Sequence, residues 1–234
     1  MKVLTEMDLR AAVRAGTVKT YRVSRDTIVT PSARSFMAER GIELVVAEGP
    51  KGQGAGEKPE FMTHLRGNDL VPKTHPRIRL RGLLDLTQAF IIQAQVVAQR
   101  EGITGLVDHL GELLEYTRQA LRAEVLDCEM PEMRIMGMSP AEIREMSHNP
   151  SQSIGIKHIL PSYRMGEVMS LLNIVRTQIR QAEIAATEVF WPEPVPGSEP
   201  SRLDILQALN RLSSAAYVMM CRLEAGAYTG GGGR

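Results

Sequence analysis

A long apolar repeat between residues 168 and 189 most constrains how this chain can fold. Its members alternate at spacings of four and three residues: Val168, Leu172, Val175, Ile179, Ala182, Ala186 and Val189. A 3.5-residue period of this length is typical of a helix that packs along a bundle or coiled-coil seam. The repeat ends at the proline-rich run 191–196, which cannot continue a helix. The sequence therefore predicts one long helix with a buried face and other helices packed on it.

Other segments also carry helical periodicity. Apolar residues recur at spacings of three and four over 83–102, 106–125 and 202–224, as on the buried face of an amphipathic helix. A capping signature beginning at Ser139 opens a shorter helix to about His148. The expected fold class is therefore mainly α, a four- to five-helix bundle with a core of Leu, Ile, Val and Met.

The N-terminal residues form a different pattern, which predicts a small α/β module before the bundle. Two short helices are expected, one ending at Gly16 and one opened by Thr30-Pro31 and ending before Gly41. A β-prone run follows each helix, over 18–23 and 42–46. A module of this size buries little apolar surface, so high stability on its own is not expected.

The domain organisation follows from these patterns. The module is assigned to residues 1–47, a flexible linker to 48–60, the helical bundle to 61–226 and a disordered tail to 227–234. The linker is rich in glycine and has no apolar periodicity, which is typical of a tether. A phosphate-binding glycine loop is the alternative interpretation, and it would require a strand before the loop and a helix after it.

Composition and charge exclude several classes of function. Twenty-eight Lys and Arg balance 27 Asp and Glu, so no general positive field favours nucleic acid or an anionic membrane. No apolar run reaches the roughly 18 residues that a membrane span needs, and two cysteines, Cys128 and Cys221, cannot build a disulfide framework. We expect a cytoplasmic protein with no nucleic-acid or membrane partner. Its five histidines lack metal-binding spacings, so no metal site is expected.

A cationic segment precedes the bundle. It holds five basic side chains and a single acidic one: Arg66, Lys73, Arg77, Arg79, Arg81 and Asp69. A solvated loop would have this composition. A phosphate clamp would have it too, because Lys and Arg supply the hydrogen-bond donors that phosphate oxygens accept.

Charged residues also flank the apolar seam of the long helix. Arg176, Arg180 and Glu183 each follow a seam position by one residue, a rotation of about 100°, so they line one edge of the seam. Their spacing allows local Arg–Glu pairing, worth roughly a few tenths of a kcal/mol at the surface. The alternative is that these partly desolvated charges serve a partner. Polar residues between Asp204 and Ser214 flank the last apolar stripe similarly, as a site wall or a solvated face would.

Two helical segments resemble a known enzyme family. The run 206–220, which contains Asn210-Arg211, resembles the last helix of the ethanolamine-utilisation corrinoid adenosyltransferases. The run 175–183 is similar to a helix of the related propanediol-utilisation type. Shorter matches follow in the family's order at 63–65, 71–73, 81–85 and 158–161.

The resemblance implies an ATP:cob(I)alamin adenosyltransferase. Such an enzyme transfers the 5′-deoxyadenosyl group of ATP to cob(I)alamin, and it yields triphosphate and the adenosylcobalamin that ethanolamine ammonia-lyase uses. ATP and cobalamin would be the substrates, with Mg²⁺ bridging phosphate oxygens. Cobalt(I) is itself the nucleophile, so no Ser, Cys or carboxylate nucleophile is required. Some members carry a cysteine-rich metal motif before the bundle; the 48–60 segment has no cysteine, so no structural transition metal is expected.

Matched positions take the roles of the family's site residues. Arg176 and Arg180 are expected to be catalytic, and Asp85 to form a structural salt bridge with Arg176, within the chain or across a subunit boundary. His158 is expected to face the corrinoid; packing, or a misaligned match at this position, is favoured over cobalt coordination. The ATP-binding residues implied by the match are Thr63, His64, Lys73, Arg77, Arg180, Glu183 and Asn210.

The resemblance also bears on assembly. It implies a homotrimer with sites between subunits, a dimer being the alternative, located in the cytoplasm or in a bacterial microcompartment. The run 30–34 is similar to peripheral-subunit-binding domains as well, so the module is compatible with docking to ethanolamine ammonia-lyase or to microcompartment proteins. Two other function classes remain open: a non-catalytic corrinoid-binding and delivery protein, and a scaffold whose helices only oligomerise.

Overall fold

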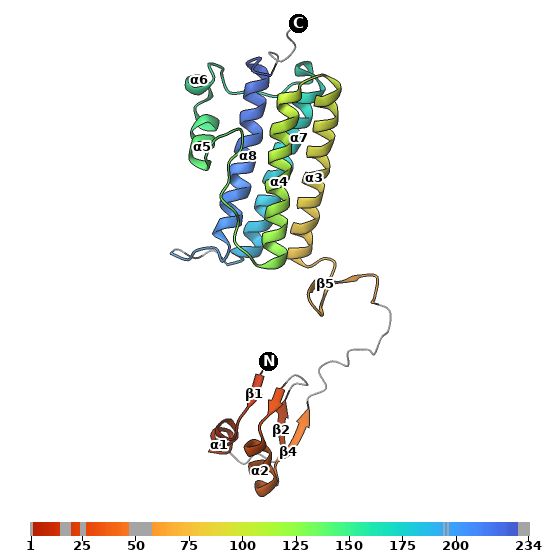
Figure 1. Cartoon of the computed structure of the whole chain (residues 1–234), viewed down its shortest axis with the longest axis vertical. Helices are drawn as coiled ribbons and strands as arrows, with labels where there is room; N and C mark the ends of the chain where they lie inside the picture. Colours follow the sequence, from red (N-terminus) through yellow and green to blue (C-terminus); the bar gives the residue numbers. More distant parts are fainter. Residues whose placement is uncertain are drawn as a thin grey trace. The chain divides into compact units, whose positions relative to one another are not determined.

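The computed structural model describes residues 2–14, 20–23, 27–46, 58–193, 195 and 197–228. The chain divides into two compact units, Met1–Lys58 and Pro59–Arg234 (Figure 1). Most of the predicted linker and residues 229–234 of the predicted tail lie outside the described residues.

In its described residues, the first unit combines two short helices with two pairs of parallel strands. Its elements are β1 (Lys2–Leu4), α1 (Glu6–Arg14), β2 (Thr20–Val23), β3 (Thr27–Val29), α2 (Pro31–Arg40) and β4 (Glu43–Val46). β1 pairs with β3 and β2 pairs with β4. The sequence predicts both helices, β2 and β4. It does not predict β1 or β3, because three residues are too few to show an alternating pattern.

The ends of α2 are where the sequence places them. Thr30 is the N-cap, and its Oγ1 accepts a hydrogen bond from the backbone N–H of Ala33 at 3.3 Å. Pro31 occupies the first helical position. Gly41 ends the helix with φ of 61°, a left-handed conformation that glycine adopts without strain. Phe36 and Met37 bury the inner face of α2 in the small core of the unit.

The second unit is a bundle of four long helices with two shorter ones beside it (Figure 1). A hairpin of antiparallel strands comes first, and a 3₁₀ turn at Tyr163–Met165 precedes the third long helix. The elements are β5 (Met62–Arg66), β6 (Asp69–Pro72), α3 (Pro76–Arg100), α4 (Thr104–Leu126), α5 (Pro140–His148), α6 (Pro150–Ser153), α7 (Gly166–Phe190) and α8 (Leu203–Glu224). The predicted fold class is confirmed: a mainly α protein with a small α/β part at its N-terminus.

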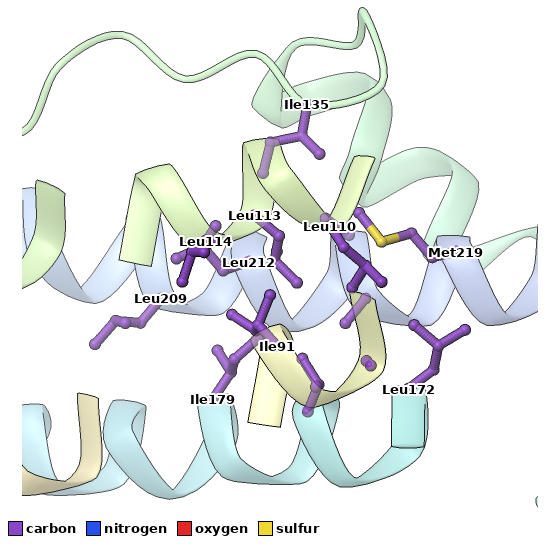
Figure 2. Close-up of a cluster of buried hydrophobic side chains, with 14 of the residues drawn as sticks. Ile91, Leu110, Leu113, Leu114, Ile135, Leu172, Ile179, Leu209, Leu212 and Met219 are labelled. Atoms are coloured by element: carbon purple, nitrogen blue, oxygen red, sulfur yellow. The ribbon is translucent and has the colours of Figure 1, made fainter. Parts of the chain in front are cut away.

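The apolar stripes of the four long helices meet in one core. Figure 2 shows one side chain from each helix pointing into this core: Ile91 of α3, Leu113 of α4, Ile179 of α7 and Leu212 of α8. All four are almost completely buried. Ile135, from the extended segment between α4 and α5, covers this core from one side. Complete burial of a Leu or Ile side chain contributes roughly 1.5–3 kcal/mol relative to exposure. The core therefore fixes the rotation of each helix, and with it the direction of the polar residues beside the stripe.

The start of the bundle differs from the prediction. α3 begins at Pro76, seven residues before the predicted start, because His75 caps it: His75 Nδ1 accepts from the N–H of Arg77 at 3.2 Å. The cationic segment before it is not simply a loop, since 62–66 and 69–72 form the hairpin. At the other end of the chain, Tyr228 packs against His109, with its hydroxyl 3.0 Å from His109 Nδ1, although it falls within the predicted tail. Among the helices that the structure describes, none is both long and apolar enough to cross a membrane.

Candidate functional site

A cleft lies between α5, α7 and α8. It has a volume of about 220 Å³ and is lined by Ser147 and His148 of α5, Arg176 and Arg180 of α7, and Ser213, Ser214 and Tyr217 of α8. Figure 1 shows α5 beside α8 at the edge of the bundle. The name "the cleft" is used for the space that these seven residues line.

The two long helices present polar side chains at this edge with the same spacing. α7 places Arg176, Arg180 and Glu183 four and three residues apart, each directly after a buried seam residue. α8 carries a second trio at the same spacing: Asn210, Ser214 and Tyr217. Residues four and three apart share one face of a helix. Two packed helices thus bring polar residues from distant parts of the sequence together.

The two arginines of the cleft, and Arg211 beside it, have no carboxylate ion-pair partner in the part of the chain that the structure describes. Among the described residues, no ion pair involves Arg176, Arg180 or Arg211. Arg176 donates from Nε and Nη2 to Oδ1 of Asn173, at 3.2 and 3.0 Å. Burial lowers the pKa of Arg176, and the charge of Arg180 lowers it further, yet an arginine stays protonated in proteins. Arg176 is half-buried and Arg180 is exposed, so the cleft is an open positive site whose inner arginine is partly desolvated, and such a pair of guanidinium groups suits a multiply charged anion.

Glu183 makes a contact across the two helices instead of a local ion pair. Its Oε1 accepts from Nδ2 of Asn210 at 2.7 Å, and Oδ1 of Asn210 accepts from Nη2 of Arg211. The local Arg–Glu pairing that the sequence allows is not formed within the described part of the chain. Three of the predicted site residues, Arg180, Glu183 and Asn210, therefore lie on the facing sides of α7 and α8.

The loop before α7 reaches the cleft at Tyr217. The Tyr217 hydroxyl accepts from the backbone N–H of Ile159 at 3.1 Å and lies 3.0 Å from Nδ1 of His158, and the His158 and Tyr217 rings stack. Burial raises the pKa of Tyr217, so the phenol stays protonated near neutral pH. On the same loop, Leu160 and Tyr163 are 88% and 85% exposed. The structure thus places His158 and an exposed apolar surface on a loop that is anchored to the cleft.

A second group of arginines lies where α3 begins and α4 ends, and each of its members is paired. Buried Glu124 accepts from Nε of both Arg77 and Arg81, at 2.5 Å in each case. Arg66 pairs with Asp127 at 3.2 Å; Arg202 contacts Asp127 at 3.4 Å and Asp204 at 2.7 Å. This basal ion-pair cluster (Arg66, Arg77, Arg81, Arg202, Glu124, Asp127, Asp204) borders a larger cavity of about 540 Å³. The predicted ATP-binding residue Arg77 thus belongs to a structural network.

The remaining predicted ATP-binding residues are not at the cleft within one chain. Thr63 and His64 lie on β5, and Lys73 directly follows β6. Next to this hairpin, Arg79 of α3 contacts Glu188 of α7 at 3.1 Å. Glu188 is eight residues beyond Arg180, about 12 Å along the helix. If one chain held a nucleotide through both the hairpin residues and the cleft arginines, that nucleotide would have to span this distance.

The predicted Asp85–Arg176 salt bridge does not form within the described chain. Asp85 is exposed on α3, where its Oδ1 accepts from Gln88 at 3.4 Å. Arg176 contacts Asn173 instead. Pairing across a subunit boundary stays a prediction.

Sequence reasoning missed the contribution of α5. Ser147 and His148 line the cleft, and the charge of Arg144 lowers the pKa of Arg211 after the larger effect of burial. The capping box at Ser139 does predict the helix, and both of its hydrogen bonds are present. The side of the bundle on which α5 packs depends on tertiary contacts, so no local pattern indicates it.

Comparison with known families decides the assignment. A family model described as cobalamin adenosyltransferase matches residues 55–223. The chain belongs to this family. The match covers the whole bundle from the hairpin to the last turn of α8, and both sides of the cleft fall within it.

Curated members of the cobalamin adenosyltransferase family include similar proteins. Two corrinoid adenosyltransferases named EutT, from Escherichia coli K12 and an O6:H1 strain, are each 35% identical over 168 residues. EutT from Salmonella typhimurium is 34% identical over 164 residues. The matches cover 70–72% of this chain but only 59–60% of these relatives. No solved structure matches the chain. Within the described ranges, no group of three or more His, Cys, Asp or Glu side chains is placed to hold a metal.

Proposed function

We propose that the protein is an ATP:cob(I)alamin adenosyltransferase that serves ethanolamine utilisation. Family membership and the relatives' names support the reaction class. In this reaction the cobalt(I) electron pair attacks the 5′ carbon of ATP. A Co–C bond forms, the C5′–O5′ bond breaks, and its electron pair leaves with triphosphate. The products are adenosylcobalamin and triphosphate.

The observation that carries the proposal is the positive cleft without carboxylate ion pairs. Negative charge develops on the departing triphosphate oxygen, and fixed cations in a site with little water stabilise that charge. The buried seam of α7 fixes the direction in which Arg176 and Arg180 leave the helix, and the contact with Asn173 also holds the Arg176 guanidinium. Their guanidinium groups form no ion pair with a carboxylate of the described chain, so their charge is available to phosphate oxygens. Glu183 and Asn210 would hold the nucleoside part through hydrogen bonds.

The cosubstrates are assigned by chemistry. Mg²⁺ would enter with ATP and bridge its phosphate oxygens; arginines cannot ligate it, which fits a cation delivered by the nucleotide. The corrinoid has a broad apolar ring, and the loop with His158, Leu160 and Tyr163 offers exposed apolar and aromatic surface beside Tyr217. We propose that His158 faces this ring.

We further propose that the enzyme is a homotrimer with sites between subunits. The separation of the β5–β6 hairpin from the cleft supports this, because Thr63, His64 and Lys73 of one chain would complete the cleft of the next. Asp85 would then pair with Arg176 of the neighbour. Sedimentation analysis should give the mass of three 25.9 kDa chains, and Asp85→Ala should shift it toward one. Ethanolamine ammonia-lyase or microcompartment proteins are the proposed partners.

The decisive test is an anaerobic assay with cob(I)alamin and Mg-ATP. We expect the wild type to consume the Co(I) spectrum and form a photolabile alkylcobalamin. Arg180→Ala should lower the rate by about 10²–10³, as removal of one transition-state donor does. The matched control is Arg118→Ala, an exposed arginine of α4 outside the cleft, which should keep the wild-type rate.

The other outcomes discriminate between the alternatives. A wild type that binds cobalamin tightly but forms no product would favour a corrinoid delivery protein. A wild type that binds neither ligand would favour a scaffold. Equal loss of rate in Arg180→Ala and Arg118→Ala would contradict the assignment of the cleft.

A further inference from the structure

The side-chain amide of Asn210 is held from both sides. Its Nδ2 donates to Oε1 of Glu183 at 2.7 Å, and its Oδ1 accepts from Nη2 of Arg211. A carboxylate only accepts hydrogen bonds and a guanidinium only donates them. The two neighbours therefore permit one of the two orientations in which an amide can lie. In that orientation Asn210 keeps one N–H and one oxygen lone pair for a ligand.

Fold stability alone does not account for Arg211. Its Nη1 is buried and has no hydrogen-bond partner among the described residues, and an unsatisfied buried donor destabilises a fold. Burial lowers the pKa of Arg211, the charge of Arg144 on α5 lowers it further, and the charge of Glu183 raises it in part. The guanidinium thus sits in a partly desolvated position, near both the like charge of Arg144 and the carboxylate of Glu183, and within the described chain it donates a hydrogen bond to Asn210. Each unsatisfied buried group in a folded protein calls for an explanation, and a functional role is one such explanation. Nε of Arg66 in the basal ion-pair cluster is unsatisfied as well, so the contact with Asn210 carries the inference.

We propose that Arg211 is a positioning residue for adenosyl transfer. By donating to Oδ1 of Asn210, it fixes the amide so that the free N–H and lone pair meet the substrate in a single orientation. Asn210 then acts as a preorganised group rather than one that must first rotate. This inference rests on the proposed function, and Arg211 itself touches Asn210 rather than the reacting atoms.

A double-mutant cycle between the two residues tests this role. Asn210→Ala, Arg211→Met and the double variant are compared for kcat and for the KM of ATP. If Arg211 acts through Asn210, each single change lowers kcat/KM on the order of tenfold, and the double variant falls little below the worse single one. Arg211→Lys should recover part of the rate, because an ammonium still donates to Oδ1.

A matched control separates positioning from general packing. Arg222 lies eleven residues further along α8, on the same helix face, and is also half-buried, with Nη2 3.7 Å from Sδ of Met138. Arg222→Met should change stability without lowering kcat/KM. Thermal unfolding of every variant reports whether it folds. Should Arg211→Met fail to fold, the cycle is run with Arg211→Gln, whose amide can donate or accept and so leaves Asn210 free to flip.

The outcomes separate this inference from the proposed function. If the wild type forms product and the rate losses of the two single variants multiply in the double variant, the two residues act independently. That result overturns the positioning role of Arg211 and leaves the proposed function intact. So does an Arg211→Met variant as active as Arg222→Met. A wild type that forms no product overturns the proposed function, and this inference with it.

Discussion

Arginines occur in two settings in the bundle, and the two differ in their partners. In the basal ion-pair cluster, every arginine contacts a carboxylate, and the Glu124 carboxylate between Arg77 and Arg81 is fully buried. At the cleft, Arg176 and Arg180 contact no carboxylate within ion-pair distance among the described residues. The paired group ties β5, α3, α4 and α8 together. The unpaired group has no counter-charge from the described chain, and we propose that a ligand supplies it.

This comparison shows that residue type alone does not identify a phosphate-binding residue. Arg77 and Arg180 are both predicted to bind ATP, yet the structure gives one of them a buried counter-charge and leaves the other without one. Breaking a buried pair leaves an uncompensated charge and is strongly destabilising. Removing a charge that has no partner should instead affect binding. Substitutions in the paired group should therefore lower stability, and those in the unpaired group should lower ligand binding.

The largest effect on stability is expected for Glu124→Ala. The change leaves Arg77 and Arg81 without their buried carboxylate, so the free energy of unfolding should fall by about 3–5 kcal/mol. Urea unfolding followed by circular dichroism measures it. Glu188→Ala is the control, because its pair with Arg79 is exposed and worth about 0–1 kcal/mol. Similar losses in the two variants would contradict the structural role of the basal cluster.

A smaller effect is expected for Arg77→Met, and it separates two interpretations of that residue. Loss of one of the two donors to Glu124 should lower the free energy of unfolding by about 1–3 kcal/mol. The KM for ATP should stay close to that of the wild type if the contact to Glu124 is the main role of Arg77. A large rise in KM with little loss of stability would instead support the ATP-binding role implied by the family match.

His109 is a further half-buried titratable group of the bundle, and its ring lies against Tyr228. Burial lowers the pKa of His109 more than Glu112 and Asp108 raise it, and Arg222 lowers it as well. The folded state therefore binds its proton more weakly than the unfolded state, whose pKa is about 6.5. The stabilisation is complete above that value and is lost as pH falls through the lowered folded pKa.

Unfolding measured between pH 8 and pH 5 tests the contribution of His109. The free energy of unfolding should decrease toward low pH, and His109→Gln should flatten part of that slope. An unchanged slope in the variant would show that other groups cause the decrease. The buried hydroxyl of Tyr228, whose pKa is raised to about 12, does not titrate in this range.

The smallest effect on stability is expected for Arg176→Gln. Because the guanidinium is partly desolvated and lies near Arg180, its removal should change the free energy of unfolding by no more than about 0.5 kcal/mol. Differential scanning calorimetry without ATP measures this change. The same measurement with ATP shows how much of the stabilisation by the nucleotide is lost in the variant. A destabilisation as large as that of Glu124→Ala would erase the difference between the two groups of arginines.

Local sequence patterns predict the parts of the fold that depend on local physics. The alternating seam gives α7 almost to the residue, and Thr30 and Gly41 mark both ends of α2. The hairpin also has a turn signal, the two-residue sequence Gly67-Asn68. The unbalanced positive charge of the segment from Arg66 to Arg81 favours its interpretation as a loop or a phosphate clamp instead.

The site is predictable only where its residues share an element. Arg176, Arg180 and Glu183 lie on one edge of one helix, so their common direction follows from the period. The pairing of Arg77 with Glu124 joins residues 47 positions apart, and the approach of Arg144 to Arg211 depends on how α5 packs. Such contacts are set by the tertiary fold, which no local pattern contains.

The strand pairing of the first unit constrains the order in which it can form. β1 pairs with β3 and β2 with β4, in parallel in both cases, so each ladder joins one of the first two strands to one of the last two. During synthesis, the first ladder cannot close before Thr27–Val29 has left the ribosome, nor the second before Glu43–Val46 has. Two fragments of the unit, separated between β2 and β3, would each hold one strand of every ladder and would regain the pairing only by associating with each other.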